Sequence, residues 1–243
     1  MTRTIENPQK FADDLEKQIE DLIQRRVLEG KFIKELEAGT LPLKALQGWA
    51  KNWYTFALEI NSSISCLYHR FGSLCKRHPD IEDIFTQRIG EELSYPGPGG
   101  HIRTMEALGK ALGVTRTDMI ENQLIPDARG AIDMYVRTIF EGTIHEICAV
   151  MLNEKAQGSN VFSKMCQCLK KSPYNLSEKD LYYLSLHGEV DIDHGEINKQ
   201  LLVKILNYEP IQERAGFGME YCATMWAEMF CRVYDGVYGV YRN

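Results

Sequence analysis

Residues 178–206 read EKDLYYLSLHGEVDIDHGEINKQLLVKIL, and their apolar side chains recur with the 3.6-residue period of one long helix. No part of the chain alternates β-branched and polar residues around a hairpin dipeptide. The sequence therefore predicts an all-α fold, a helical bundle. The same period recurs in segments at about 8–28, 31–38, 42–71, 79–94, 101–113, 126–156, 159–169 and 209–238, with ends good to about three residues.

The composition is that of a single globular domain over residues 1–243, with residues 1–30 expected as a peripheral N-terminal helix. Its 28 basic and 34 acidic side chains give a net charge of −6, which argues against a nucleic-acid or anionic-membrane partner. The longest apolar run, 147–152, is too short to cross a bilayer, and residues 1–14 hold no signal-peptide core. Seven cysteines, an odd number, indicate reduced thiols and a cytoplasmic protein.

Three polar side chains interrupt the apolar stripe of the segment 178–206. His187, Asp191 and His194 are spaced so that they lie within about 40° of one line on a helix. That line continues through apolar residues and therefore faces the core. Burying two imidazoles and a carboxylate is costly unless other groups satisfy them. A hydrogen-bonded polar cluster would do so, and so would a metal ion, since these ligand types suit Fe, Mn or Zn.

Polar residues fall on inward-facing lines in three other segments as well. Glu92 lies inside an apolar arc, with Glu91 at the edge of that arc. His101 starts one apolar stripe, and Glu154 ends another. Each has an ordinary explanation when taken singly, such as a helix start or a snorkelling side chain. Together with the first three they give histidines and carboxylates from four helices, which is the set that a two-metal carboxylate site requires.

The line that ends at Glu154 assumes one unbroken helix over 126–156. On that helix Phe140 faces the core, His145 faces outward and Glu146 lies at the margin.

Several motifs of the chain resemble those of the pyrroloquinoline-quinone synthases. The similarity covers about residues 35–238 and implies the haem-oxygenase-like fold, a seven-helix bundle in a single domain. The motifs are LQGWAKNWY at 46–54, GG at 99–100, EALGKALG at 106–113, IPDARGAIDMY at 125–135, DIDHG at 191–195 and MWAEM at 225–229.

The chain departs from the synthase pattern in ways that change its expected chemistry. Trp53 replaces an arginine, Glu92 replaces a histidine, and His187 stands where the synthases have no histidine. These changes remove substrate-anchoring groups and add metal ligands. The chain more closely resembles the haem-oxygenase-like diiron oxidases, which include a chlamydial para-aminobenzoate-forming protein and a cyanobacterial enzyme that converts a tryptophan side chain to a nitrile.

This resemblance implies a full set of metal ligands. The pattern of the group is a Glu, a His soon after it, a second Glu, and then His-x3-Asp-x2-His. It corresponds in this chain to Glu92, His101, Glu154, His187, Asp191 and His194. Glu91 is the alternative first carboxylate. The implied cofactors are two Fe(II)/Fe(III) ions, with O2 as co-substrate.

The resemblance also implies a reaction class and partners. An O2-dependent oxidase acting on a small molecule is favoured, with an amino acid as the substrate and a tryptophan derivative as one option. Members of the group are often homodimers, so a homodimer is expected. The chlamydial relative modifies itself, and Lys164 lies near the position of its donor lysine, which makes self-modification a further option.

Three other functions stay open. A cofactor-free oxidase of the pyrroloquinoline-quinone synthase type would keep the fold without the metal. A thiaminase-like hydrolase would need a reactive thiol, for which Cys148 is the candidate. The third alternative is a non-enzymatic interaction protein with a structural metal site. Haem binding is disfavoured because it needs a histidine near the N-terminus, and the first one in the chain is His69.

Overall fold

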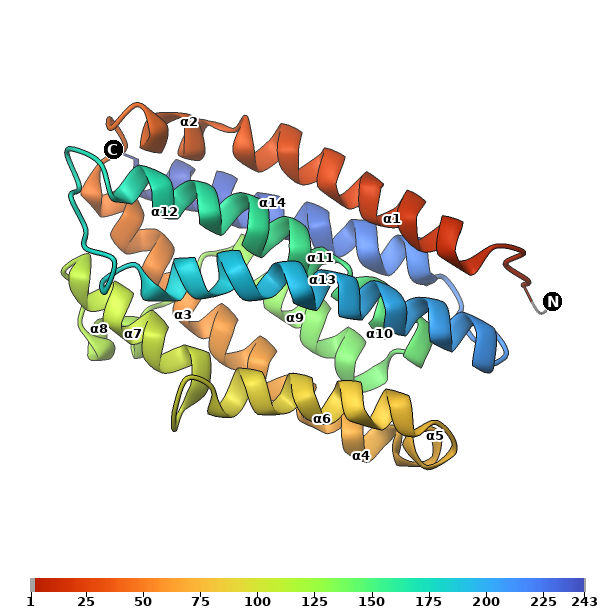
Figure 1. Cartoon of the computed structure of the whole chain (residues 1–243). Helices are drawn as coiled ribbons and strands as arrows, with labels where there is room; N and C mark the ends of the chain where they lie inside the picture. The colour runs from red at the N-terminus through yellow and green to blue at the C-terminus, as the bar shows by residue number, and fades with distance from the viewer. Residues whose placement is uncertain (1–2, 243) are drawn as a thin grey trace.

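The computed structural model describes residues 3–242, apart from the side chains of residues 189–192. Every regular element in this range is helical, which confirms the all-α prediction (Figure 1). The α-helices are α1 (Pro8–Ile23), α2 (Lys31–Glu37), α3 (Leu43–Ile64), α4 (Cys66–Arg70), α5 (Gly72–Arg77), α6 (Pro79–Ser94), α7 (Gly100–Ala111), α8 (Arg116–Ile120), α9 (Pro126–Glu141), α10 (Ile144–Met151), α11 (Asn153–Lys155), α12 (Ser163–Leu169), α13 (Tyr182–Tyr208) and α14 (Met219–Tyr241). Two π-helical turns, η1 (Gln24–Leu28) and η2 (Ala156–Phe162), follow α1 and α11.

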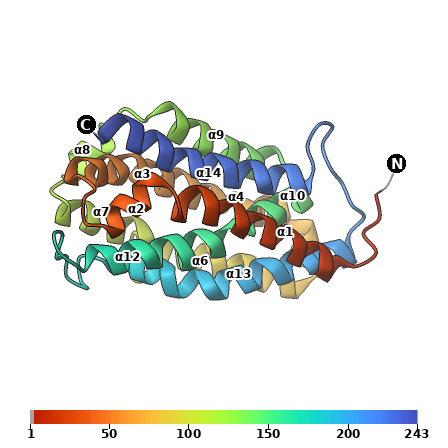
Figure 2. The same ribbon diagram turned by 90° about the horizontal axis from the view of Figure 1, so that it is seen from above.

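The long helices run along a common direction around one hydrophobic core (Figure 1, Figure 2). Helix α14 packs against α9, α10, α1 and α3, while α13 packs against η2, α10, α11 and α1. Helix α1 buries Leu15, Ile19 and Ile23 in this core. Within residues 3–242, no helix is both long enough and apolar enough to cross a membrane.

The segment 126–156 is not the single helix that its periodicity predicts. Helix α9 ends at Glu141, and Gly142 then takes an extended conformation. Thr143 starts α10 with a capping box, in which its hydroxyl accepts from the backbone N–H of Glu146 and the Glu146 carboxylate accepts from the backbone N–H of Thr143. A glycine followed by a strong N-cap therefore ends one helix and begins another.

The break changes which side chains face the core. Phe140, predicted to point inward, is 54% exposed. His145, predicted to point outward, is 1% exposed, and Glu146 is fully buried. The two non-helical residues 142–143 rotate α10 relative to α9, so a projection that runs through them assigns the wrong faces.

The predicted helix over 209–238 begins only at Met219, and residues 209–218 are not helical. Glu146 accepts hydrogen bonds from the backbone N–H of Arg214 at 2.7 Å and from its Nε at 2.6 Å. These two bonds hold the non-helical segment against the start of α10. The contact joins residues far apart in sequence, which local periodicity cannot reveal.

Glu146→Ala should therefore destabilise the fold by about 2–3 kcal/mol, because it removes both a helix cap and the buried partner of Arg214. Urea unfolding of the metal-free protein measures this loss. Glu146→Gln keeps one carbonyl oxygen for the Arg214 backbone and should lose clearly less. Equal losses in the two variants would contradict the role given to these hydrogen bonds.

Candidate metal centre

The turn between α6 and α7 brings Glu92 next to His101. Gly99 and Gly100 have positive φ values of 90° and 54°, which let the chain reverse and start α7 at once. His101 Nδ1 then lies 2.8 Å from Glu92 Oε2, and both side chains are buried. Burial raises the pKa of Glu92, but the contact with His101 and the charge of Arg88 outweigh it, so that the pKa lies well below its usual value. These contacts favour the ionised form of the Glu92 carboxylate.

His187 joins this pair from α13. Its Nδ1 lies 2.8 Å from the backbone carbonyl oxygen of Tyr183 and donates to it, since a carbonyl can only accept. In the neutral imidazole, Nε2 then carries a lone pair, as metal-binding histidines require. The centroids of the His187 and His101 rings are 4.6 Å apart.

These three residues form a compact group that fits one divalent metal ion. One ligand atom from each of Glu92, His101 and His187 lies within 4.8 Å of the other two, and all three residues are buried. Nε2 of His101 is buried without a hydrogen-bond partner in the described part of the chain. A carboxylate with two imidazoles is a common ligand set for iron, manganese and zinc. We refer to these three residues as the Glu92 group.

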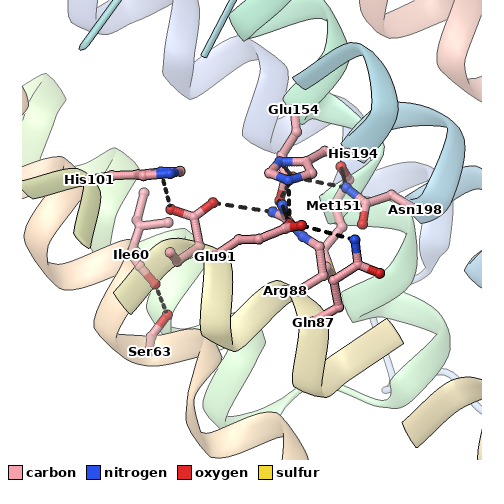
Figure 3. A network of polar contacts seen from close by, with 11 residues as sticks. Ile60, Ser63, Gln87, Arg88, Glu91, His101, Met151, Glu154, His194 and Asn198 are labelled. Carbon is pink, nitrogen blue, oxygen red and sulfur yellow. Dashed lines mark hydrogen bonds and ion pairs between the residues drawn. The ribbon is translucent and has the colours of Figure 1, made fainter. Parts of the chain in front are cut away.

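A second polar cluster lies beside the Glu92 group (Figure 3). Glu154 Oε2 accepts a hydrogen bond from Asn198 Nδ2 at 3.0 Å, and His194 Nδ1 lies 4.0 Å from the same oxygen. His194 Nε2 donates to Glu91 Oε2 at 2.6 Å. A second carboxylate and a third imidazole therefore lie side by side.

Arg88 lies between the two clusters and is not among the residues predicted from the sequence. Its Nη2 is 2.5 Å from Glu154 Oε2 and 3.4 Å from Glu92 Oε1 (Figure 3). A signal for it was present, because Arg88 lies one helical turn before Glu92 and so shares its buried face. Asn198 could have been found in the same way, one turn after His194.

The six proposed ligands thus fall into three sets. The Glu92 group holds three of them, and Glu154 with His194 lies across Arg88 from that group. The side chain of Asp191 lies outside the described residues. A first metal ion fits the Glu92 group as it stands, while a second ion bound through Glu154 Oε2 would compete with the Arg88 guanidinium for that oxygen.

A small cavity of about 70 Å³ adjoins the Glu92 group. The π-helical turn η2 contributes Gln157 and Phe162, which lie five residues apart, to its wall. The other lining residues are Trp53, Phe56, Ala57, Ile60, Asn61, Glu92, Tyr135, Glu154, Tyr183, His187 and Trp226. Burial raises the pKa of Tyr135 well above its ordinary value, so this phenol stays protonated. The cavity is thus aromatic, with Glu92, Glu154 and His187 at its wall.

Two other candidate residues lie away from this cavity. Cys148 is fully buried and does not line the cavity, and burial raises the pKa of its thiol. Such a thiol is a poor nucleophile, because the thiolate is the reactive form. Lys164 forms an ion pair with Glu37 at the rim of a different hollow, between α2, η1 and α12.

Known proteins resemble this chain over most of its length. Residues 16–186 match the TENA/THI-4/PQQC family. A 4-aminobenzoate synthase from Chlamydia pneumoniae is 23% identical over 212 residues, which cover 87% of this chain and 90% of the relative. A pyrroloquinoline-quinone synthase from Cronobacter sakazakii is 28% identical over 99 residues, 40% of this chain and 38% of the relative.

Solved structures share the fold at low sequence identity. A domain with a haem-oxygenase-like fold from Shewanella denitrificans superposes with a TM-score of 0.68 at 14% identity, covering 98% of this chain and 94% of that one. A CADD-like protein of unknown function from Nostoc punctiforme gives a TM-score of 0.72 at 11% identity, covering 96% and 100%. The predicted haem-oxygenase-like fold is therefore confirmed. With the family match over residues 16–186, the chain belongs to the TENA/THI-4/PQQC family.

Proposed function

We propose that this chain is an O2-dependent non-haem diiron oxidase that acts on a small molecule in a biosynthetic pathway. One observation carries the proposal: a buried carboxylate–imidazole group, two of whose members line an aromatic cavity. The names of its relatives, which are synthases, support a biosynthetic role. An amino acid is the favoured substrate, with a tryptophan derivative as one option.

The contacts of the proposed centre support a division of tasks among its residues. When bound, iron would supply the electrons that reduce O2. The Tyr183 carbonyl fixes the tautomer of His187 and so leaves a lone pair on its Nε2, the form in which imidazole binds a metal ion. Glu92 contributes negative charge, and its contact with His101 orients both side chains. The aromatic walls surround a bound substrate and limit the access of water.

The aromatic cavity is the proposed substrate site, and filling it should block binding. Ala57 is 5% exposed and lines the cavity, so Ala57→Phe would place a ring inside it. We expect the affinity for L-tryptophan, used as a probe in calorimetry, to fall by about tenfold or more, since less of the probe's apolar surface can be buried. Metal uptake should stay unchanged.

Ala107→Phe is the matched control, because Ala107 is exposed on α7 and does not line the cavity. Its affinity for the probe should equal that of the wild type. An Ala57→Phe protein that binds the probe as the wild type does would rule out this cavity as the amino-acid site.

Anaerobic loading with Fe(II), followed by rapid mixing with O2, tests the function directly. Uptake of two ions per chain and a transient change in the near-ultraviolet and visible absorbance are expected. Stoichiometric uptake without any O2 reaction would instead favour a structural metal site. Substrate oxidation by metal-free protein would favour a cofactor-free oxidase.

A further inference from the structure

Arg88 is a counter-ion shared by both halves of the proposed centre. Besides its contacts with Glu92 and Glu154, its Nη1 lies 3.7 Å from Glu91 Oε2. Three carboxylates thus surround one guanidinium, and only 4% of the Arg88 side chain is exposed. Glu92 is buried, whereas Glu91 and Glu154 are 28% and 21% exposed, and carboxylates so close together repel one another unless a cation lies among them.

The two oxygens of Glu92 have different neighbours. Oε2 lies 2.8 Å from His101, while Oε1 lies 3.4 Å from Arg88. An ion held by Glu92 Oε2 and the two imidazoles can therefore bind while Arg88 remains in place.

Glu154 shares one of its oxygens between two donors. Its Oε2 accepts from Arg88 at 2.5 Å and from Asn198 at 3.0 Å, so two donors already use this oxygen. A metal ion bound through Glu154 Oε2 competes with Arg88 for that atom. The two proposed metal positions are therefore not equivalent.

We infer that Arg88 is a resident cation: its guanidinium holds the second metal position in the metal-free protein and must leave that position before a second ion binds. This inference rests on the proposed metal centre. The first ion adds to the Glu92 group, whereas the second exchanges one cation for another and gives up the bonds between Arg88 and Glu154.

Calorimetric titration of the metal-free, full-length protein with Zn(II) tests the inference. Arg88→Met removes the charge and keeps an unbranched side chain. We expect the second ion to bind more weakly than the first in the wild type. In Arg88→Met its affinity should rise by about tenfold or more, the equivalent of one charge-assisted hydrogen bond, while that of the first ion changes little.

Arg137→Met is the matched control, because Arg137 is 64% exposed and pairs across one turn with Glu141. Both zinc affinities should stay as in the wild type. Arg88→Lys keeps the charge but loses the planar guanidinium, so the ratio of its two zinc affinities should lie between the ratios of the wild type and Arg88→Met. This variant replaces Arg88→Met if the latter does not fold.

The metal-free proteins give a second readout. Without a cation among its carboxylates, Arg88→Met should unfold at a lower temperature than Arg137→Met, and zinc should restore part of the difference. Equal unfolding temperatures, an unchanged ratio of the two affinities, or a second ion that binds more weakly in Arg88→Met would each overturn the inference. If neither the wild type nor Arg88→Met binds zinc, the proposed centre itself is wrong. One zinc ion bound by the wild type and two bound by Arg88→Met would support both the proposed centre and the inference about Arg88.

Discussion

His187→Ala is expected to remove one iron ion per chain and to abolish the reaction with O2. The ligand atom of His187 lies within 4.8 Å of those of Glu92 and His101, and the Tyr183 carbonyl fixes its ring. Losing a hydrogen-bond partner of a ligand already costs about 10- to 100-fold in metal affinity, so losing the ligand itself should cost more than about 100-fold. Anaerobic Fe(II) titration and stopped-flow mixing with O2 measure the two effects.

His69→Ala is the control for this variant, because His69 is exposed on α4 and has no part in the proposed centre. Its iron content and O2 reaction should match those of the wild type. His194→Ala adds a second comparison, since it should lose the other ion and keep the one held by the Glu92 group. A His187→Ala protein that still reacts with O2 at the wild-type rate would exclude the Glu92 group as the O2-reactive centre.

The helix boundaries that could be predicted are those with local signals. Proline at the first position and a regular apolar period give 79–94 for α6, which the structure confirms as Pro79–Ser94. The break at Gly142 and the non-helical course of 209–218 depend on Glu146, which binds Arg214 across the fold. A projection along a single segment contains no information on that contact.

Prediction of the proposed metal centre from the sequence is limited in the same way. Inward-facing lines could single out Glu92, His101 and His187, because each interrupts an apolar stripe on its own helix, and the structure brings these three together. Such lines do not show how the ligands divide between ions. In the proposed centre that division depends on Arg88, which pairs with Glu154 from a distant part of the chain.

Gly100→Ala is expected to damage both the fold and the centre. Gly100 has a φ of 54°, a conformation that is strained for alanine. An added Cβ would also collide with the carbonyl oxygen of Glu92 and come within 2.8 Å of the carbonyl carbon of Leu93. Backbone atoms cannot rotate away as a side chain can, so the turn must open. The expected loss is about 3 kcal/mol or more of unfolding free energy, measured by urea denaturation of the metal-free protein.

The same substitution should weaken the binding of the first metal ion, because opening the turn draws His101 away from Glu92. Gly97→Ala is the matched control: Gly97 lies in the same turn, lacks a positive φ, and a Cβ there would meet nothing within 4 Å. Its stability should stay within about 0.5 kcal/mol of the wild type, and its zinc affinity should be unchanged. If Gly100→Ala loses stability but keeps full zinc affinity, the tight turn serves the fold alone. The contact between His101 and Glu92 would then have to be maintained by the packing of α7 against α13.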